Sequence, residues 1–161
     1  MKIKSYYKIK PEEWLLPDHP YVRNQQKKAI ADPSLNLEEY VRQWILNEII
    51  ERYNYPKEWL GQRIVIEYPV MVNTTTTNYV DVAILNEKNT PYLFIECKKL
   101  GEVLEGPQKA IEQLQASLSV TYTTNVGMAT NGDENFCFLK QIDPKEFINH
   151  LNLYQKIDIA L

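Results

Sequence analysis

Two short β-type runs joined by a turn constrain the fold of this chain more than any other feature. Residues 79–85 and 92–98 are rich in β-branched and aromatic side chains, and residues 86–91 between them carry turn-forming types. This pattern predicts a β-hairpin. Side chains two apart on a strand share a face, so we expect Glu96 and Lys98 to project together. Cys97 should point to the opposite face as a small buried residue.

An aspartate, Asp81, lies on the first of these runs, and Glu96 and Lys98 end the second. Phosphodiester hydrolysis needs such groups, because carboxylates that hold Mg²⁺ help to activate a water and to neutralise charge in the transition state. We predict Asp81 and Glu96 as metal ligands, with Mn²⁺ as a substitute for Mg²⁺. Lys98 would orient or deprotonate the water, or stabilise developing negative charge.

A simpler interpretation is a strand-end ion pair between Glu96 and Lys98, with Asp81 completing a turn. Two observations favour the metal site. No other glutamate in the chain has lysine two positions later, and the residues just before Glu96 are typical of a buried strand. Charges that emerge at the end of a core strand need a partner or a metal ion.

Composition is that of a globular protein. The 161 residues fit a single domain, with an N-terminal arm expected at 1–33 and a core at 34–161. No apolar run reaches the roughly 20 residues of a membrane helix, so no membrane partner is expected. The absence of an apolar secretory signal and the presence of only two cysteines favour a cytoplasmic location. A net charge of −3 provides no overall basic field for nucleic acid, although local lysines can still form a channel.

Apolar spacing and capping residues predict the helices. A short basic helix is expected at 22–31, within the arm, and a longer one at 37–53, capped by Ser34 or Asn36. Another is expected at 108–120. A last helix should begin at Asp143, which is followed by proline and then by glutamate at the third helical position.

Further strands are expected on both sides of the hairpin. Residues 63–72 indicate a strand in which Pro69 marks an edge position or a bulge. This strand and the hairpin together predict an antiparallel meander. Residues 126–130 and 136–140 predict two more strands around the Asn131-Gly132 turn. The expected order is therefore helix, three strands, helix, two strands, helix.

Asp81, followed fifteen positions later by Glu96-x-Lys98 and then by a helix and a strand, resembles the PD-(D/E)xK nuclease superfamily. Six segments in order make a closer resemblance, to the N-terminal nuclease domain of the type I restriction enzyme motor (R) subunit. They are EYVRQ at 39–43, YPKE at 55–58, VDVAI at 80–84, IECK at 95–98, AIEQ at 110–113 and TNG at 130–132. The resemblance covers about 37–140.

This resemblance implies an α/β (α+β) fold with a restriction-endonuclease-like core, in which helices flank a mixed sheet of about five strands. It implies Mg²⁺-dependent cleavage of DNA, with Asp81 and Glu96 as ligands and Lys98 as the catalytic lysine. A glutamate of the first core helix often reaches the metal in such nucleases. Glu39 matches it best and Glu38 is the near alternative, whereas the helix dipole alone also favours acids at these positions.

The chain departs from the family pattern in two ways. Gln113 begins a Gln-x-x-x-Tyr motif, but Ser117 stands where tyrosine is expected, so Gln113 is either a DNA ligand or a surface glutamine. Lys99 and Arg42 are further candidate phosphate contacts, with a solvated surface role as the alternative. The chain also carries no phosphate-binding loop of a helicase.

A protein of this kind therefore acts on DNA alone or with a separate motor or specificity subunit. Cutting both strands with a single active site usually demands two copies, which makes a homodimer a further expectation. The competing function is a catalytically inactive module that binds nucleic acid or serves assembly on the nuclease fold.

Overall fold

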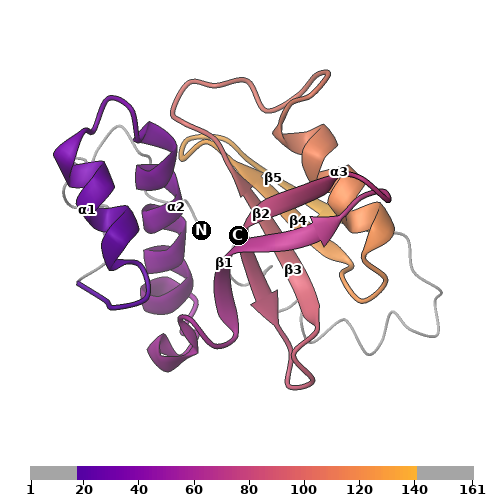
Figure 1. Ribbon diagram of the computed structural model, residues 1–161, viewed down its shortest axis with the longest axis horizontal. Coiled ribbons are helices and arrows are strands. Elements are labelled where there is room, and N and C mark those ends of the chain that lie inside the picture. Colours follow the sequence, from indigo (N-terminus) through magenta and orange to yellow (C-terminus); the bar gives the residue numbers. More distant parts are fainter. Residues whose placement is uncertain (1–17, 141–161) are drawn as a thin grey trace.

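The computed structural model describes residues 18–140, and its centre is a five-stranded sheet with helices on both faces (Figure 1). Figure 1 shows α1 and α2 on one side of the sheet and α3 on the other. The expected α/β fold, a mixed sheet flanked by helices, is confirmed. In chain order the elements are α1 (Arg23–Ala31), α2 (Leu37–Asn47), the π-helix η3 (Glu48–Arg52), the 3-10 helix η4 (Lys57–Trp59), β1 (Ile64–Met71), β2 (Thr77–Leu85), β3 (Pro91–Cys97), α3 (Ala110–Val120), β4 (Val126–Thr130) and β5 (Asn135–Leu139).

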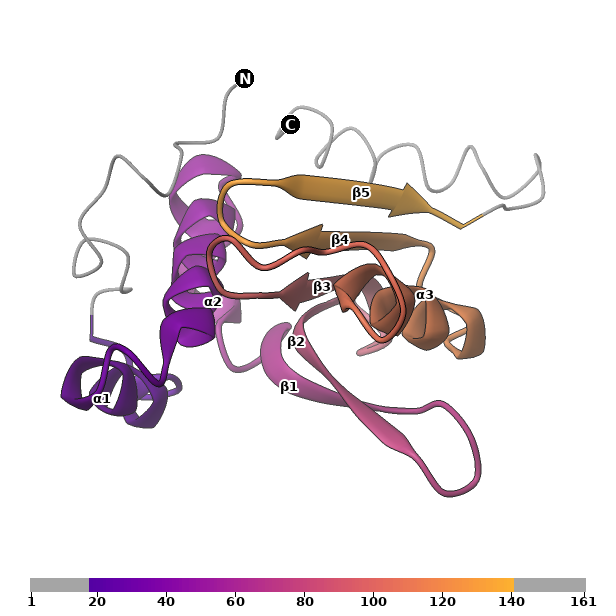
Figure 2. The ribbon, with the colours of Figure 1, turned by 90° about the horizontal axis from the view of Figure 1, so that it is seen from above.

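The sheet begins with the antiparallel meander that the sequence predicts. The strand order is β1-β2-β3-β4-β5, and β1, β2 and β3 pair antiparallel. β3 and β4 are parallel, which requires a crossover, and α3 supplies it. β5 returns antiparallel to β4 through the Asn131-Gly132 turn, where Gly132 has a φ of +90°. Figure 2 shows the turn between β1 and β2 projecting away from the other strands.

Alternating strand residues divide between two hydrophobic cores. Ile95 and its neighbours on one face pack with Ile45 of α2, and Phe94 on the other face packs with Leu114 of α3. Cys97 lies on the α2 side with no exposed surface, as expected, and burial raises the pKa of its thiol. Because both faces are covered, β3 is buried along its whole length.

The helix expected within the N-terminal arm forms and belongs to the core. Val22, which precedes α1, and Ala29 within it are fully buried. The Tyr40 hydroxyl of α2 donates to the Ala29 carbonyl at 2.9 Å. Residues 22–31 are therefore part of the packed structure rather than a detached arm.

The expected cap of α2 has a different role. Asn36 occupies the N-cap position, but its side chain makes no hydrogen bond to α2. Its amide donates instead to the Lys28 carbonyl of α1 at 3.2 Å and to the Asp32 carbonyl at 2.7 Å. The Asp32 N–H also donates to the Lys28 carbonyl, at 3.1 Å, so Asn36 adds a second donor there and ties the start of α2 to the end of α1.

The long helix expected at 37–53 is present, with its last turn widened into the π-helix η3. The helix expected from Asp143 lies outside the described residues. Within 18–140, no helix has the length and apolar character needed to cross a membrane.

A break in β1 turns the hairpin toward α3. Glu67 has a φ of +52°, and the ladder between β1 and β2 skips it. Ile66 packs in the core under α2, whereas Tyr68, two positions later, packs against the core under α3. Strict alternation would place both residues on one face. Pro69 follows this break on an edge strand, as the sequence predicts.

Candidate active site

Three carboxylates form a row across neighbouring strands. Val82 of β2 pairs with Ile95 of β3, so one step along this antiparallel register places Asp81 beside Glu96. On the other side of β2, Glu67 is skipped by the ladder but lies between the pairs Ile66–Val82 and Tyr68–Val80, next to Asp81. Cross-strand neighbours share a face of the sheet. The hairpin thus brings together Asp81 and Glu96, as the sequence predicts, and adds Glu67.

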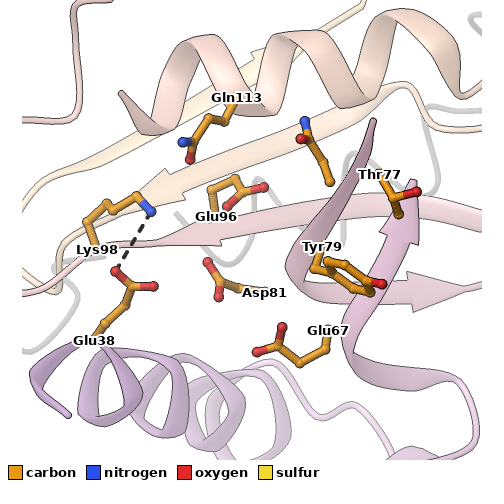
Figure 3. A pocket seen from close by; sticks show the side chains of 9 residues that line it. Glu38, Glu67, Thr77, Tyr79, Asp81, Glu96, Lys98 and Gln113 are labelled. Carbon is orange, nitrogen blue, oxygen red and sulfur yellow. Dashed lines mark ion pairs between the residues drawn. The ribbon is translucent and has the colours of Figure 1, made fainter. Parts of the chain in front are cut away.

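These three carboxylates line a cavity of about 290 Å³. Figure 3 shows Glu38 reaching in from α2, Gln113 from α3, and Tyr79 and Thr77 from β2. Lys98, directly after β3, points into the same space (Figure 3). The complete lining is Glu38, Glu67, Thr77, Asn78, Tyr79, Asp81, Glu96, Lys98 and Gln113.

Asp81 and Glu96 are buried side by side on adjacent strands. Burial raises the pKa of Glu96 to about 9, and the neighbouring charge of Asp81 is the next cause. Burial also raises the pKa of Asp81, although the Cys97 N–H and the Arg42 guanidinium oppose the shift. The metal-free pair therefore retains a proton near neutral pH. Such a pair is unfavourable while fully ionised and attractive to a cation.

Lys98 forms an ion pair across the cavity with Glu38 of α2, with 3.7 Å between Nζ and Oε2 (Figure 3). Burial lowers the pKa of Lys98, but Glu38, Asp81 and Glu96 outweigh it, and the net pKa is raised. Lys98 is therefore held as an ammonium ion. Burial, followed by the charge of Asp81, raises the pKa of Glu38.

The two candidate helix acids have different surroundings. Glu38 lines the cavity with Lys98, Asp81 and Glu96. Glu39 is held away from it by Arg42 and by Gln43, whose Nε2 donates to Glu39 Oε1 at 2.8 Å. Glu39, the better match from sequence, is thus engaged in ion pairing, and the geometry favours Glu38.

Arg42 is not the surface phosphate contact that the sequence suggested. Its side chain is only 9% exposed and forms ion pairs with Glu39 and Glu67. Its Nη1 also lies 3.5 Å from Asp81 Oδ1. Three carboxylates surround one buried guanidinium, so Arg42 acts as their internal counter-charge.

The other candidate DNA contacts differ in placement. Gln113 lines the cavity, where its Nε2 donates to the Gln108 carbonyl at 3.3 Å. Lys99 is exposed, next to the site but outside the cavity lining. Ser117, where the motif has tyrosine, is fully buried on the sheet side of α3 and has no hydrogen bond through its hydroxyl.

Tyr79 and Glu67 line the cavity but were not anticipated from the sequence. Tyr79 lies two positions before Asp81 on the same strand, so alternation alone would have found it. Glu67 carried no such signal, because it comes from a strand separated from β2 by a polar loop that does not define a register. Its place depends on pairing between strands.

The oxygen-only donor set of this cavity fits a hard cation. Mg²⁺ binds through one or two carboxylates and completes its shell with waters and substrate phosphates. Within residues 18–140, no three His, Cys, Asp or Glu side chains form a ready cluster for a metal. The fit to a hard cation therefore rests on the Asp81–Glu96 pair.

Comparison with known families decides where this chain belongs. The family described as type I restriction enzyme R protein N terminus (HSDR_N) matches residues 37–152, well over half of the sequence. The chain belongs to this family. Membership in HSDR_N relates the protein to restriction enzymes and to nuclease function, and agrees with the resemblance noted from the sequence. No curated protein and no solved structure gave a significant match.

Proposed function

We propose that this protein is a Mg²⁺-dependent deoxyribonuclease of the restriction-endonuclease type. The observation that carries the proposal is the buried Asp81–Glu96 pair on adjacent strands, with Lys98 in the same cavity. Family membership adds a restriction system as the setting and DNA as the substrate. Other subunits, including a separate motor or specificity subunit, would then deliver the DNA.

Asp81 and Glu96 would hold the cation, which supplies Lewis acidity for the phosphate and lowers the pKa of a bound water. Their burial keeps the carboxylates from reorienting into solvent, and the Cys97 N–H, 2.7 Å from Asp81 Oδ2, fixes one oxygen. Glu38, which lines the same cavity, is better placed than Glu39 to join them through a water.

Lys98 would act as a fixed positive charge. Its raised pKa favours the ammonium form, which donates hydrogen bonds and cannot accept a proton from water. This supports orientation of the water or stabilisation of the phosphorane-like charge over a general-base role. Glu38 forms an ion pair with Lys98 Nζ and would limit the positions that the ammonium group can take.

The test is cleavage of plasmid and single-stranded DNA by the purified chain in Mg²⁺, Mn²⁺ or EDTA. Glu96→Ala and Lys98→Ala should each abolish metal-dependent cleavage. Glu87→Ala and Lys88→Ala are matched controls, because these residues lie in the exposed β2–β3 turn and should leave cleavage unchanged.

Cleavage that survives both Glu96→Ala and Lys98→Ala would contradict the proposal. DNA binding without cleavage under every metal condition would instead support the inactive binding module. Measuring binding and cleavage on the same preparations separates the two functions.

A further inference from the structure

A buried polar network supports Asp81 from outside the cavity. The two oxygens of this carboxylate have different partners, since Oδ2 accepts from the Cys97 N–H at 2.7 Å and Oδ1 faces Arg42 Nη1 at 3.5 Å. The first partner belongs to the adjacent strand and the second to α2. Asp81 is thus held between the sheet and a helix.

Arg42 is itself fixed by other side chains. Glu39 pairs with Nη2 on the same helix, and Glu67 pairs with Nη1 from β1. The planar guanidinium presents several donors in a rigid fork, so contacts in different directions define its orientation. Arg42 therefore joins α2, β1 and β2 at one point.

The network continues away from the site to α1. Gln43 Nε2 donates to Glu39 Oε1 at 2.8 Å, and Gln26 Nε2 of α1 donates to Gln43 Oε1 at 3.3 Å. Gln43 has no exposed surface and Gln26 has 5%. Buried side-chain amides in proteins are normally hydrogen-bonded, and these two follow that rule. Both hydrogen bonds are donated toward the site, from Gln26 to Gln43 and from Gln43 to Glu39.

We propose that Arg42 is a positioning residue for the divalent-cation site and that Gln26, Gln43 and Glu39 hold it in place. The proposal rests on the function proposed above. A cation shared by Asp81 and Glu96 needs both carboxylates in a fixed relation. Partners that orient metal-ligating side chains typically change metal affinity by about 10- to 100-fold when removed. Docking of α1 thereby contributes to the affinity of a site that it does not touch.

The experiment measures Mn²⁺ binding to the full chain by loss of the free-ion electron paramagnetic resonance signal. Arg42→Lys keeps the charge but loses the fork, and should weaken Mn²⁺ binding by about 10- to 100-fold. Gln43→Met removes the link to Glu39 with an unbranched side chain of similar length, and should weaken binding by a smaller factor. Arg52→Lys is the matched control, since Arg52 pairs with Glu48 at 3.2 Å away from the cavity.

Thermal unfolding in EDTA, recorded on each variant, separates a positioning role from a structural one. A purely structural role lowers the unfolding temperature and leaves the Mn²⁺ dissociation constant of the folded protein unchanged. If Arg42→Lys does not fold, Gln43→Met alone decides.

Wild-type affinity in the folded variants would overturn the positioning role while the nuclease proposal stands. Failure of the wild type to bind Mn²⁺ in a Glu96-dependent way would overturn both. Weaker binding in Arg42→Lys and Gln43→Met, with Arg52→Lys unchanged, supports the inference.

Discussion

Glu67 shows how a single residue shapes the site. Among the described strand residues other than glycine, it alone has a positive φ, of +52°, a region that costs a side-chain-bearing residue about 1–3 kcal/mol. The surrounding contacts offset this cost, because the conformation directs the carboxylate to Arg42 and turns the following strand toward α3. Strain of this kind often marks functional positions.

Substitutions at Glu67 should separate the backbone cost from the ion pair. Glu67→Val should lower the free energy of unfolding by about 1–3 kcal/mol, because a β-branched residue is least compatible with this φ. Glu67→Asn also loses the carboxylate but tolerates the left-handed region, and should be less destabilising. Urea denaturation of both variants checks the difference. Equal losses would show that the ion pair, and not the backbone, sets the cost.

Among the secondary-structure elements, the β2–β3 hairpin could be predicted from the sequence. The residues that α2 contributes to the site could not. A strand repeats every two residues, so the alternation in 79–85 and 92–98 was enough to put Asp81 and Glu96 on one face. Neighbouring residues of a helix differ by about 100° around its axis. Which of Glu38 and Glu39 meets the cavity therefore depends on how α2 docks. The burial of Arg42 depends on the same long-range packing.

Packing of α3 on the sheet depends on Gly127 in β4. A Cβ at this position would lie 2.8 Å from Leu118 Cδ1 and 3.0 Å from the Leu114 side chain. Gly127→Ala should destabilise the fold by about 1–3 kcal/mol through overpacking. Combining it with Leu118→Ala should recover part of the loss, which a double-mutant cycle by chemical denaturation would detect. Additive effects would exclude direct contact as the cause.

Under the proposed function, we predict that the β1–β2 hairpin contacts DNA beside the carboxylates. Tyr79 is 61% exposed although it lines the cavity, and stacking of a base on an aromatic ring contributes about 1–3 kcal/mol. Tyr79→Ala should weaken single-stranded DNA binding by about tenfold or more, whereas Tyr79→Phe should retain it. Fluorescence anisotropy with a labelled oligonucleotide measures both. Tyr122, which is 94% exposed and outside the cavity, provides the control through Tyr122→Ala.

For the molecule as a whole, the acidic site links stability to pH. The pKa of Glu96 rises from 4.5 to about 9 on burial, so between these values the folded state keeps a proton that the unfolded chain releases. This contribution is full below about pH 4.5 and is lost as the pH rises toward 9, so the free energy of unfolding falls over this window.

Chemical denaturation in EDTA at several pH values between 5 and 9 tests this link. Glu96→Gln stays neutral throughout and should flatten the pH dependence relative to wild type. Mg²⁺ should restore wild-type stability at the alkaline end, because the cation replaces the proton. A wild-type profile parallel to that of Glu96→Gln would contradict the assignment.

The hairpin register also has a kinetic consequence. Asp81 and Glu96 meet when one local hairpin closes, an event on the microsecond scale, whereas Glu38 and Arg42 arrive only when α2 packs on the sheet. During folding, the two acids therefore come together before Arg42 reaches them. A divalent cation can take the place of this charge early, so we expect refolding to be faster in Mg²⁺ than in EDTA, and the difference to vanish in Glu96→Gln.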